Sequence, residues 1–282
     1  MLLLLGAAML GAPAASTAAA PIDEDTYRAE TTGGAVFIGP LVAETEDDVT
    51  LETDFGTVTI RRAHLERFQA IDPARIRSGV YWFDNPQPTR HLFTPNALSL
   101  GRGQGYYQNA WIFFNNVNYG ISDHVSIGGG LVPTFLFGAS EVPFWLLPKA
   151  SVSLPDVPIH LAGGAMIGGV IGNSALGLLY AISTVGTADR NLSVGVGYGY
   201  EDGSLARRPA LNVSGVVRLS ASMYLVTENY VLPSDGGVLS AGLRWAPENF
   251  AVDFGLIRPV GADIGAGFIG VPWLGVAIPF GR

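Results

Sequence analysis

The sequence contains no cysteine, a single lysine and few charged residues, which make up 14% of its 282 residues. Without cysteine, the chain has no disulfide, no thiolate metal site, no cysteine nucleophile and no lipid-bearing cysteine of a bacterial lipoprotein. Its net charge of −8 offers no basic surface to a phosphate backbone, so we expect no nucleic-acid partner. It also lacks a G-x-S-x-G elbow, an H-E-x-x-H motif and metal-ligand spacings, so we expect neither a metal nor a cofactor.

Glycine and apolar residues are abundant instead, with 37 glycines and 48% hydrophobic residues. Residues 191–200, NLSVGVGYGY, alternate strictly between two kinds of side chain. One face is apolar, from Leu192 to Tyr200, whereas the opposite face carries only asparagine, serine and glycine. Apolar residues toward lipid and small residues toward a tight polar lumen are typical of transmembrane β-barrels. We therefore predict an all-β chain that forms a porin-like antiparallel barrel in the outer membrane of a Gram-negative bacterium.

Ten further segments after residue 105 show strand patterns with turn residues between them. They are residues 106–119, 125–137, 144–154, 158–170, 175–185, 209–219, 223–232, 238–245, 250–258 and 268–280. With residues 191–200 these make eleven strands, and residues 91–100 supply an irregular first strand. Bacterial single-chain barrels have even strand numbers, so we predict about 12 strands. Ten is the alternative, if one short hairpin is a loop.

Three regions are expected to precede the barrel. A short apolar run followed by small residues is typical of a signal peptide, which implies export. The predicted divisions are a signal peptide at residues 1–20, an acidic periplasmic β module at 21–72, a connector at 73–104 and the barrel at 105–282. In the connector, Pro86, Pro88 and Pro95 argue against a central strand, and Trp82 and Phe83 are expected to be buried against the barrel end.

The region at residues 21–72 shows short alternating runs. The expected strands are residues 35–44, 49–53 and 57–61, and residues 64–69 close the unit. The tripeptide Asp54-Phe55-Gly56 is a turn signal between the second and third strands. The pattern resembles a small SH3- or Sm-like β module. Because it is acidic and exported, we interpret it as a periplasmic cap or an adaptor with a periplasmic protein partner, rather than as an RNA-binding module.

One long stretch favours a different interpretation. Residues 159–188 contain no acidic or basic side chain except His160 and are long enough for a transmembrane helix. Against a helix stand the Gly172-Asn173-Ser174 break and the alternation of residues 176–182. An inner-membrane helical protein built on this stretch remains an alternative to the barrel.

The strand phases place five charged side chains on the face opposite the apolar one. They are Lys149, Arg218, Glu228, Arg244 and Asp253. In lipid a lysine or arginine would cost about 2–4 kcal/mol at mid-bilayer, so these residues are expected to face the lumen. Four of them alternate in sign along neighbouring strands, which predicts a lumen salt-bridge network. The network either plugs a narrow barrel and fixes its register, which near-cancellation of charge favours, or forms a selectivity lining.

Catalysis by a lipid-modifying barrel enzyme would need a nucleophile with a base, or a histidine near a carboxylate. The candidates are Asp123 with His124 at a strand start, and His160 on an inward face. An Asp-His pair at a turn is common, so these residues are a weak basis for chemistry.

Several strings are similar to an uncharacterised family of outer-membrane proteins common in Bacteroidota. They are YWFDNPQPTR at residues 81–90, GYYQN at 105–109, NNVNYGISD at 115–123, SIGGG at 126–130 and WLGVAIPF at 273–280. The resemblance implies a signal peptide, a short N-terminal β module and a glycine-rich barrel, and it implies no activity. Here Phe280 is followed by Gly281-Arg282, which departs from the aromatic last residue that many such barrels present to the assembly machinery.

The leading hypothesis is a non-enzymatic outer-membrane barrel, either a narrow channel or a plugged scaffold. Its expected partners are outer-membrane lipid, the barrel assembly machinery and a periplasmic protein that contacts residues 21–72. A lipid-modifying enzyme and an inner-membrane helical protein are the alternatives.

Overall fold

The computed structural model describes residues 25–133, 142–170, 175–201, 204–233, 236–261 and 268–281. The chain divides into two compact units, with the boundary between Gly79 and Val80. Both units are built from antiparallel strands, and each has a core of its own. The predicted turn Gly172-Asn173-Ser174 lies outside the described residues.

The first unit is a five-stranded sheet in the order β4-β3-β2-β1-β5. Its elements are β1 (Thr26–Thr31), β2 (Val36–Glu44), β3 (Asp48–Thr53), β4 (Gly56–Arg61), η1 (Arg62–His64), β5 (Leu65–Ile71) and η2 (Pro73–Arg75). Ala29, Val49 and Leu51 are fully buried at its centre. The last strand returns to pair with the first after a short 3₁₀ turn, as the predicted SH3-like module requires. The sequence pattern missed β1, in which only Tyr27 and Ala29 are apolar.

The second unit contains the barrel. β6 (Ile76–Arg77) still belongs to the first unit; after β7 (Val80–Tyr81), the strands of the second unit run in chain order to the C-terminus. They are β8 (Gly105–Ala110), β9 (Phe114–Gly120), β10 (Val125–Leu131), β11 (Pro143–Leu146), β12 (Lys149–Ser153), β13 (Ile159–Val170), β14 (Ala175–Gly186), β15 (Arg190–Glu201), β16 (Ser204–Leu205), β17 (Ala210–Arg218), β18 (Met223–Leu232), β19 (Gly236–Trp245), β20 (Ala251–Val260) and β21 (Val271–Phe280).

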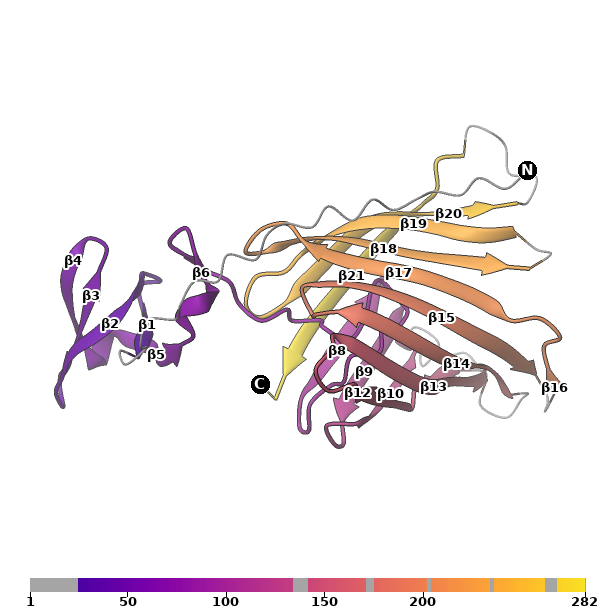
Figure 1. Cartoon of the computed structure of the whole chain (residues 1–282), viewed down its shortest axis with the longest axis horizontal. Helices are drawn as coiled ribbons and strands as arrows, with labels where there is room; N and C mark the ends of the chain where they lie inside the picture. Colours follow the sequence, from indigo (N-terminus) through magenta and orange to yellow (C-terminus); the bar gives the residue numbers. More distant parts are fainter. Residues whose placement is uncertain are drawn as a thin grey trace. The chain divides into compact units, whose positions relative to one another are not determined.

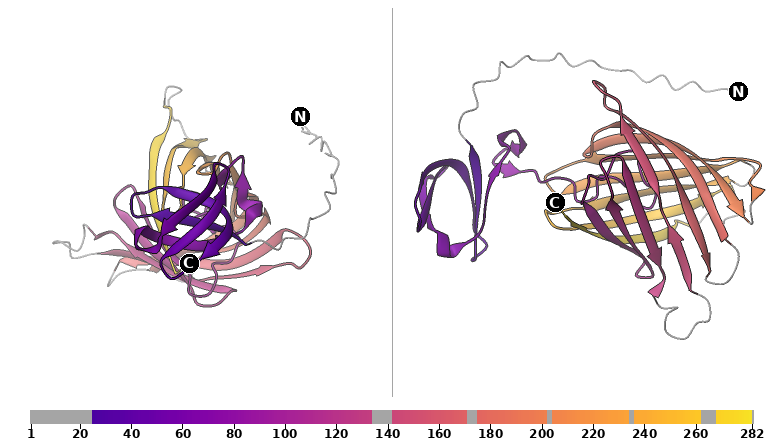
Figure 2. Two further views of the ribbon diagram at one scale, coloured as in Figure 1. Left: turned by 90° about the vertical axis from the view of Figure 1, so that its left-hand side faces the viewer. Right: turned by 90° about the horizontal axis from the view of Figure 1, so that it is seen from below.

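Each barrel strand pairs antiparallel with its neighbour in the chain, and β21 pairs with β8, which closes the ring. β11 and β12 both pair with β10 and with β13, so they form one strand that is interrupted at Pro148. β16 pairs only with β15. Over the described residues the result is a closed barrel of twelve strands (Figures 1 and 2). The predicted fold class and strand number are confirmed.

Two of the predicted strands were nevertheless wrong, and the two errors cancel in the count. Residues 106–119 are not one strand but the hairpin of β8 and β9. Their turn is made by Trp111 and Ile112, which adopt positive φ angles of 48° and 68° without any glycine, so no turn signal was visible. Residues 91–100 are not a barrel strand; their structure is part of the candidate site.

The helical alternative for residues 159–188 is wrong. This stretch forms β13 and β14, which pair from Ile159↔Val185 to Gly169↔Ala175. Within the described parts of the chain, no helix is long and apolar enough to cross a membrane.

The two faces of the barrel wall differ as the alternation in the sequence predicts. On β15, Leu192 and Val194 are more than half exposed on the outside, whereas Ser193 is fully buried on the inside. Glycine on the inner face makes room for large groups: a Cβ at Gly164 would overlap the ring of Tyr180, its cross-strand partner. The outer face is therefore suited to lipid, and the inner face is suited to a filled interior.

Replacing Val194 by arginine tests which face meets lipid. Val194 lies midway along β15 and points outward, so Val194→Arg should cost about 2–4 kcal/mol of folding free energy in a bilayer. The measurement is reversible denaturant unfolding in lipid vesicles. Leu219→Arg, one residue past the end of β17, is the matched control and should cost about 0–1 kcal/mol because it lies near the interface. Equal losses at both positions would contradict this placement of the membrane.

Candidate functional site in the barrel lumen

The interior of the barrel is occupied by the chain segment that precedes β8. We call residues 85–100 the inner segment. Figure 1 shows this part of the chain entering at the end of the barrel where the C-terminus lies. It turns back at the isolated bridge between Arg90 and Pro95 and then returns toward the start of β8. His91, Leu92 and Asn96 are all at most 1% exposed, whereas Phe93 at the tip of the turn is 38% exposed.

Local chemistry shapes the inner segment. Asn85 accepts a hydrogen bond from the backbone N–H of Gln87, and Asn96 does the same for Leu98, each at 2.9 Å. These are Asx turns, which bend a chain without help from a sheet. Pro86, Pro88 and Pro95 carry no N–H, so three backbone donors that would need partners inside the barrel are absent. The prolines that exclude this segment from the sheet therefore suit it to the lumen.

Glu228 on β18 binds the tip of the inner segment. Its Oε2 accepts hydrogen bonds from three consecutive backbone N–H groups, those of residues 92, 93 and 94, each at 2.9 Å. Its Oε1 accepts from the hydroxyls of Thr94 at 3.0 Å and Tyr230 at 2.6 Å. Successive N–H groups that converge in this way form an anion-binding nest. The carboxylate is 3% exposed, and charge-assisted hydrogen bonds offset the cost of its burial.

Arg244 on β19 binds the same part of the inner segment, but it donates hydrogen bonds to carbonyl groups, whereas Glu228 accepts them from N–H groups. Its Nε and Nη2 donate to the two carboxylate oxygens of Asp253 at 2.6 and 3.0 Å, a bidentate pair. The remaining N–H groups donate to backbone carbonyls of residues 87, 90 and 91. Arg244 is completely buried, and Asp253 is 2% exposed. The guanidinium thus joins the wall to the incoming arm of the inner segment.

The returning arm is held by the other side of the wall. Lys149 Nζ on β12 donates to the carbonyls of Asn96 at 3.1 Å and Leu98 at 2.7 Å. Thr184 Oγ1 on β14 accepts from the N–H of Ala97 at 2.9 Å. Close approach also needs a glycine on the wall, since a Cβ at Gly120 would overlap the backbone of residue 101. Wall and segment are therefore complementary in shape as well as in hydrogen bonding.

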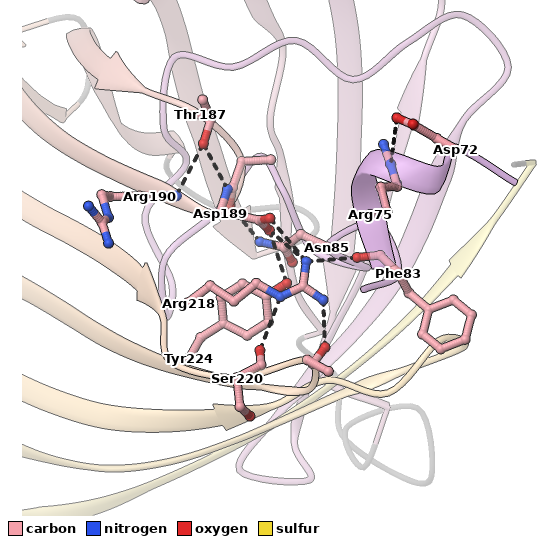
Figure 3. Close-up of polar contacts among 12 residues, drawn as sticks. Asp72, Arg75, Phe83, Asn85, Thr187, Asp189, Arg190, Arg218, Ser220 and Tyr224 are labelled. Atoms are coloured by element: carbon pink, nitrogen blue, oxygen red, sulfur yellow. Dashed lines mark hydrogen bonds and ion pairs between the residues drawn. The ribbon is translucent and has the colours of Figure 1, made fainter. Parts of the chain in front are cut away.

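Arg218 lies at the end of the barrel at which the inner segment enters, and it binds the chain there. Its Nη1 donates to both carboxylate oxygens of Asp189 at 3.0–3.1 Å and to the carbonyl of Phe83 at 2.8 Å (Figure 3). Its guanidinium stacks 4.8 Å from the ring centre of Trp82 and 5.1 Å from that of Tyr224. Arg218 thereby ties residues 82–83, just before the inner segment, to the turns that follow β14 and β17.

The five charges predicted to face the lumen all point into it, but they do not form a continuous network. Only Arg244 and Asp253 pair with each other. Arg218 pairs with Asp189, a turn residue that the strand phases did not single out. Lys149 and Glu228 bind backbone groups instead of opposite charges. What unites the five is that four of them bind residues 83–98 directly and the fifth orients Arg244.

The residues considered for catalysis are not brought together into a site. Asp123 accepts a hydrogen bond from the backbone N–H of Arg102, and His124 lies exposed in the turn before β10. The His160 ring lies between the Ser153 hydroxyl at 2.7 Å and the Gly186 carbonyl at 3.1 Å. Within the described ranges, no three histidine or acidic side chains group as metal ligands.

Sequence reasoning missed the inner segment as an element, although two signals pointed to it. The prolines excluded residues 86–95 from the sheet, and the lumen charges needed partners of some kind. The partners are backbone groups of the inner segment, and backbone groups leave no trace in the side-chain pattern of a sequence. The interior residues Thr184 and Asn191, which hold Ala97 and His91, were hidden because serine, threonine and asparagine are common on any lumen face.

Removing Arg244 should destabilise the barrel strongly. Arg244→Ala leaves the Asp253 carboxylate buried without its partner, and breaking such a pair costs about 3–5 kcal/mol. Denaturant unfolding of the protein refolded in lipid vesicles measures the change. Arg258→Ala, an exposed arginine on β20, is the control and should change stability little. A loss for Arg244→Ala no larger than that of the control would contradict a buried, structurally important pair.

No protein-family model matches the chain, and no curated protein sequence matches it. Similar solved structures include a KdgM porin described in complex with disordered oligogalacturonate, at 8% identity and a TM-score of 0.46 over 63% of this chain and 98% of that chain. Another is the Acinetobacter baumannii outer membrane protein Omp33, at 9% identity and a TM-score of 0.34 over 66% and 100%. The Bacteroidota-type family resemblance accordingly stays a prediction.

Proposed function

We propose that this protein is a channel-type outer-membrane barrel whose lumen is held closed by its own inner segment. The observation that carries the proposal is the use made of the buried lumen charges. Arg244, Glu228 and Lys149 direct hydrogen bonds to the backbone of the inner segment, not to solvent or to a water-filled pore. Of the two interpretations of these charges, plugging is therefore better supported than a selectivity lining.

The size of the barrel supports the same conclusion. A barrel of about eight strands is filled by its own side chains, whereas barrels of about 16 strands leave an aqueous channel. Twelve strands lie between these limits, so the interior needs an additional filling. The inner segment supplies it: Leu92 packs among inward-facing residues that include Val216, Tyr224 and Val226. Without the segment, the polar inner faces of the wall would surround an open passage.

Orientation follows from the turns. β8 begins and β21 ends at the same end of the barrel, where Gly105 pairs with Phe280. The turns at that end are short, as periplasmic turns of outer-membrane barrels are. The inner segment would then enter from the periplasm, and the module formed by β1–β5 would be periplasmic. A periplasmic adaptor role for that module, with a protein partner, is part of the proposal.

Deleting the inner segment should open the barrel. In planar bilayers the wild-type protein should show little or no conductance, whereas a variant with residues 86–99 replaced by a short Gly/Ser linker should show discrete steps. Arg244→Ala, which loosens the segment without removing it, should show brief and rarer openings. Far-UV circular dichroism of each variant verifies that the barrel is folded. Large steady steps in the wild type, or a folded deletion variant that stays silent, would contradict the proposal.

A reversible crosslink separates movement of the segment from general leakiness. The chain has no native cysteine, so a pair can be introduced without interference. Ala97→Cys and Thr184→Cys lie where the returning arm meets β14, with the N–H of Ala97 2.9 Å from Thr184 Oγ1. In the Arg244→Ala background, bridging the pair with a thiol-specific crosslinker should abolish the openings, and reduction should restore them. Openings that persist in the crosslinked protein would show that current does not depend on the segment.

A further inference from the structure

An apolar cavity of about 240 Å³ lies inside the barrel beyond the tip of the inner segment. Phe93 and Pro95 of the tip line it, together with Met166, Leu178 and Ile182 of the wall. Met166 and Leu178 lie on the halves of β13 and β14 farther from the entry of the segment, and Ile182 lies near the middle of β14. A dry cavity of about 150 Å³ already accepts benzene, so this one is large enough for an organic ligand.

Arg90 lines the same cavity and has no acidic partner among the residues that the structure describes. Its side chain is 3% exposed, and its Nε makes no hydrogen bond within the described part of the chain. Its remaining contacts are weak: a 3.5 Å approach of Nη2 to Asn118 Oδ1, and the rings of Phe93 and Tyr106, each 5.9 Å from the guanidinium carbon. The other two arginines of the lumen, Arg218 and Arg244, each pair with an aspartate. A buried cation without a counter-charge is costly unless an anion joins it.

We propose that this cavity binds a small amphiphile, a carboxylate with a medium-length apolar chain. The carboxylate would pair with Arg90, which is suited to bidentate binding of a planar anion. The apolar chain would lie against Phe93, Leu178 and Ile182. Gly195 and Gly197 on the inner face of β15 leave the space open, since a Cβ at Gly197 would approach the Leu178 side chain to 2.9 Å. This inference rests on the cavity and Arg90, and it holds whether or not the barrel conducts.

The test is equilibrium binding of radiolabelled decanoate to the full-length protein in phosphatidylcholine nanodiscs, with empty nanodiscs subtracted. Saturable binding is expected, with decanol and acetate each competing at least tenfold more weakly because one lacks the charge and the other lacks the chain. Arg90→Met should abolish the preference for decanoate over decanol. An absence of saturable binding, or equal affinity for decanol and decanoate in the wild type, would overturn the proposal.

A pair of tryptophan substitutions keeps the test independent of Arg90. Ala210 lies on the inner face of β17 and lines the cavity, in the same phase as buried Asn212 and Ser214. Ala210→Trp should fill the cavity and weaken decanoate binding at least tenfold. Val213→Trp, on the outer face of the same strand, should leave binding within twofold of the wild type. Equal effects of the two substitutions would show that decanoate binds elsewhere and would refute this site.

Discussion

The structure depends on one constraint: a charge or a backbone polar group removed from water needs a partner. The barrel wall places Glu228, Arg244 and Lys149 inside, where no lipid reaches but where little water remains. The inner segment brings an irregular backbone into the same space. The Glu228 carboxylate accepts hydrogen bonds from N–H groups, and the two cations donate hydrogen bonds to carbonyls. The wall and the segment therefore supply each other's hydrogen-bond partners.

The kind of contact between wall and segment changes along the length of the lumen. At the entry end, Arg218 and Asp189 form a partly exposed ion pair, and Arg218 also binds Phe83, just before the segment. In the middle, the contacts are charge-assisted and dry. Beyond the tip, the polar pairing stops, and the cavity is lined by apolar side chains with one arginine. The charge-assisted contacts in the middle and the chemically distinct cavity beyond the tip both follow from where the segment turns back.

The sequence predicted the wall well because alternation is a local property. Leu192 and Val194 face out and Ser193 faces in, as the period of two requires, and the inward direction of Arg218 and Arg244 followed from the same rule. The sequence-based prediction was wrong where a turn is formed by residues that are unusual in turns. The Trp111-Ile112 turn has no glycine, asparagine or aspartate, so β8 and β9 were merged into one strand. In the first unit, the strands expected at residues 35–44, 49–53 and 57–61 correspond to β2, β3 and β4, although β1 was too polar to be seen.

By itself, the sequence determined an all-β barrel, the two faces of its wall and the charged residues that face its interior. The predicted number of strands agreed with the structure because two opposite errors cancelled. Side-chain periodicity, turn residues and the cost of charge in lipid act within a strand, so they can be read from the chain directly. Only the tertiary structure decided what those charges bind. Glu228 lies 134 residues or more along the chain from the N–H groups that donate to it, and Arg244 lies more than 150 residues from the carbonyls to which it donates. Backbone groups look alike in every residue, so no sequence pattern could identify them as the partners.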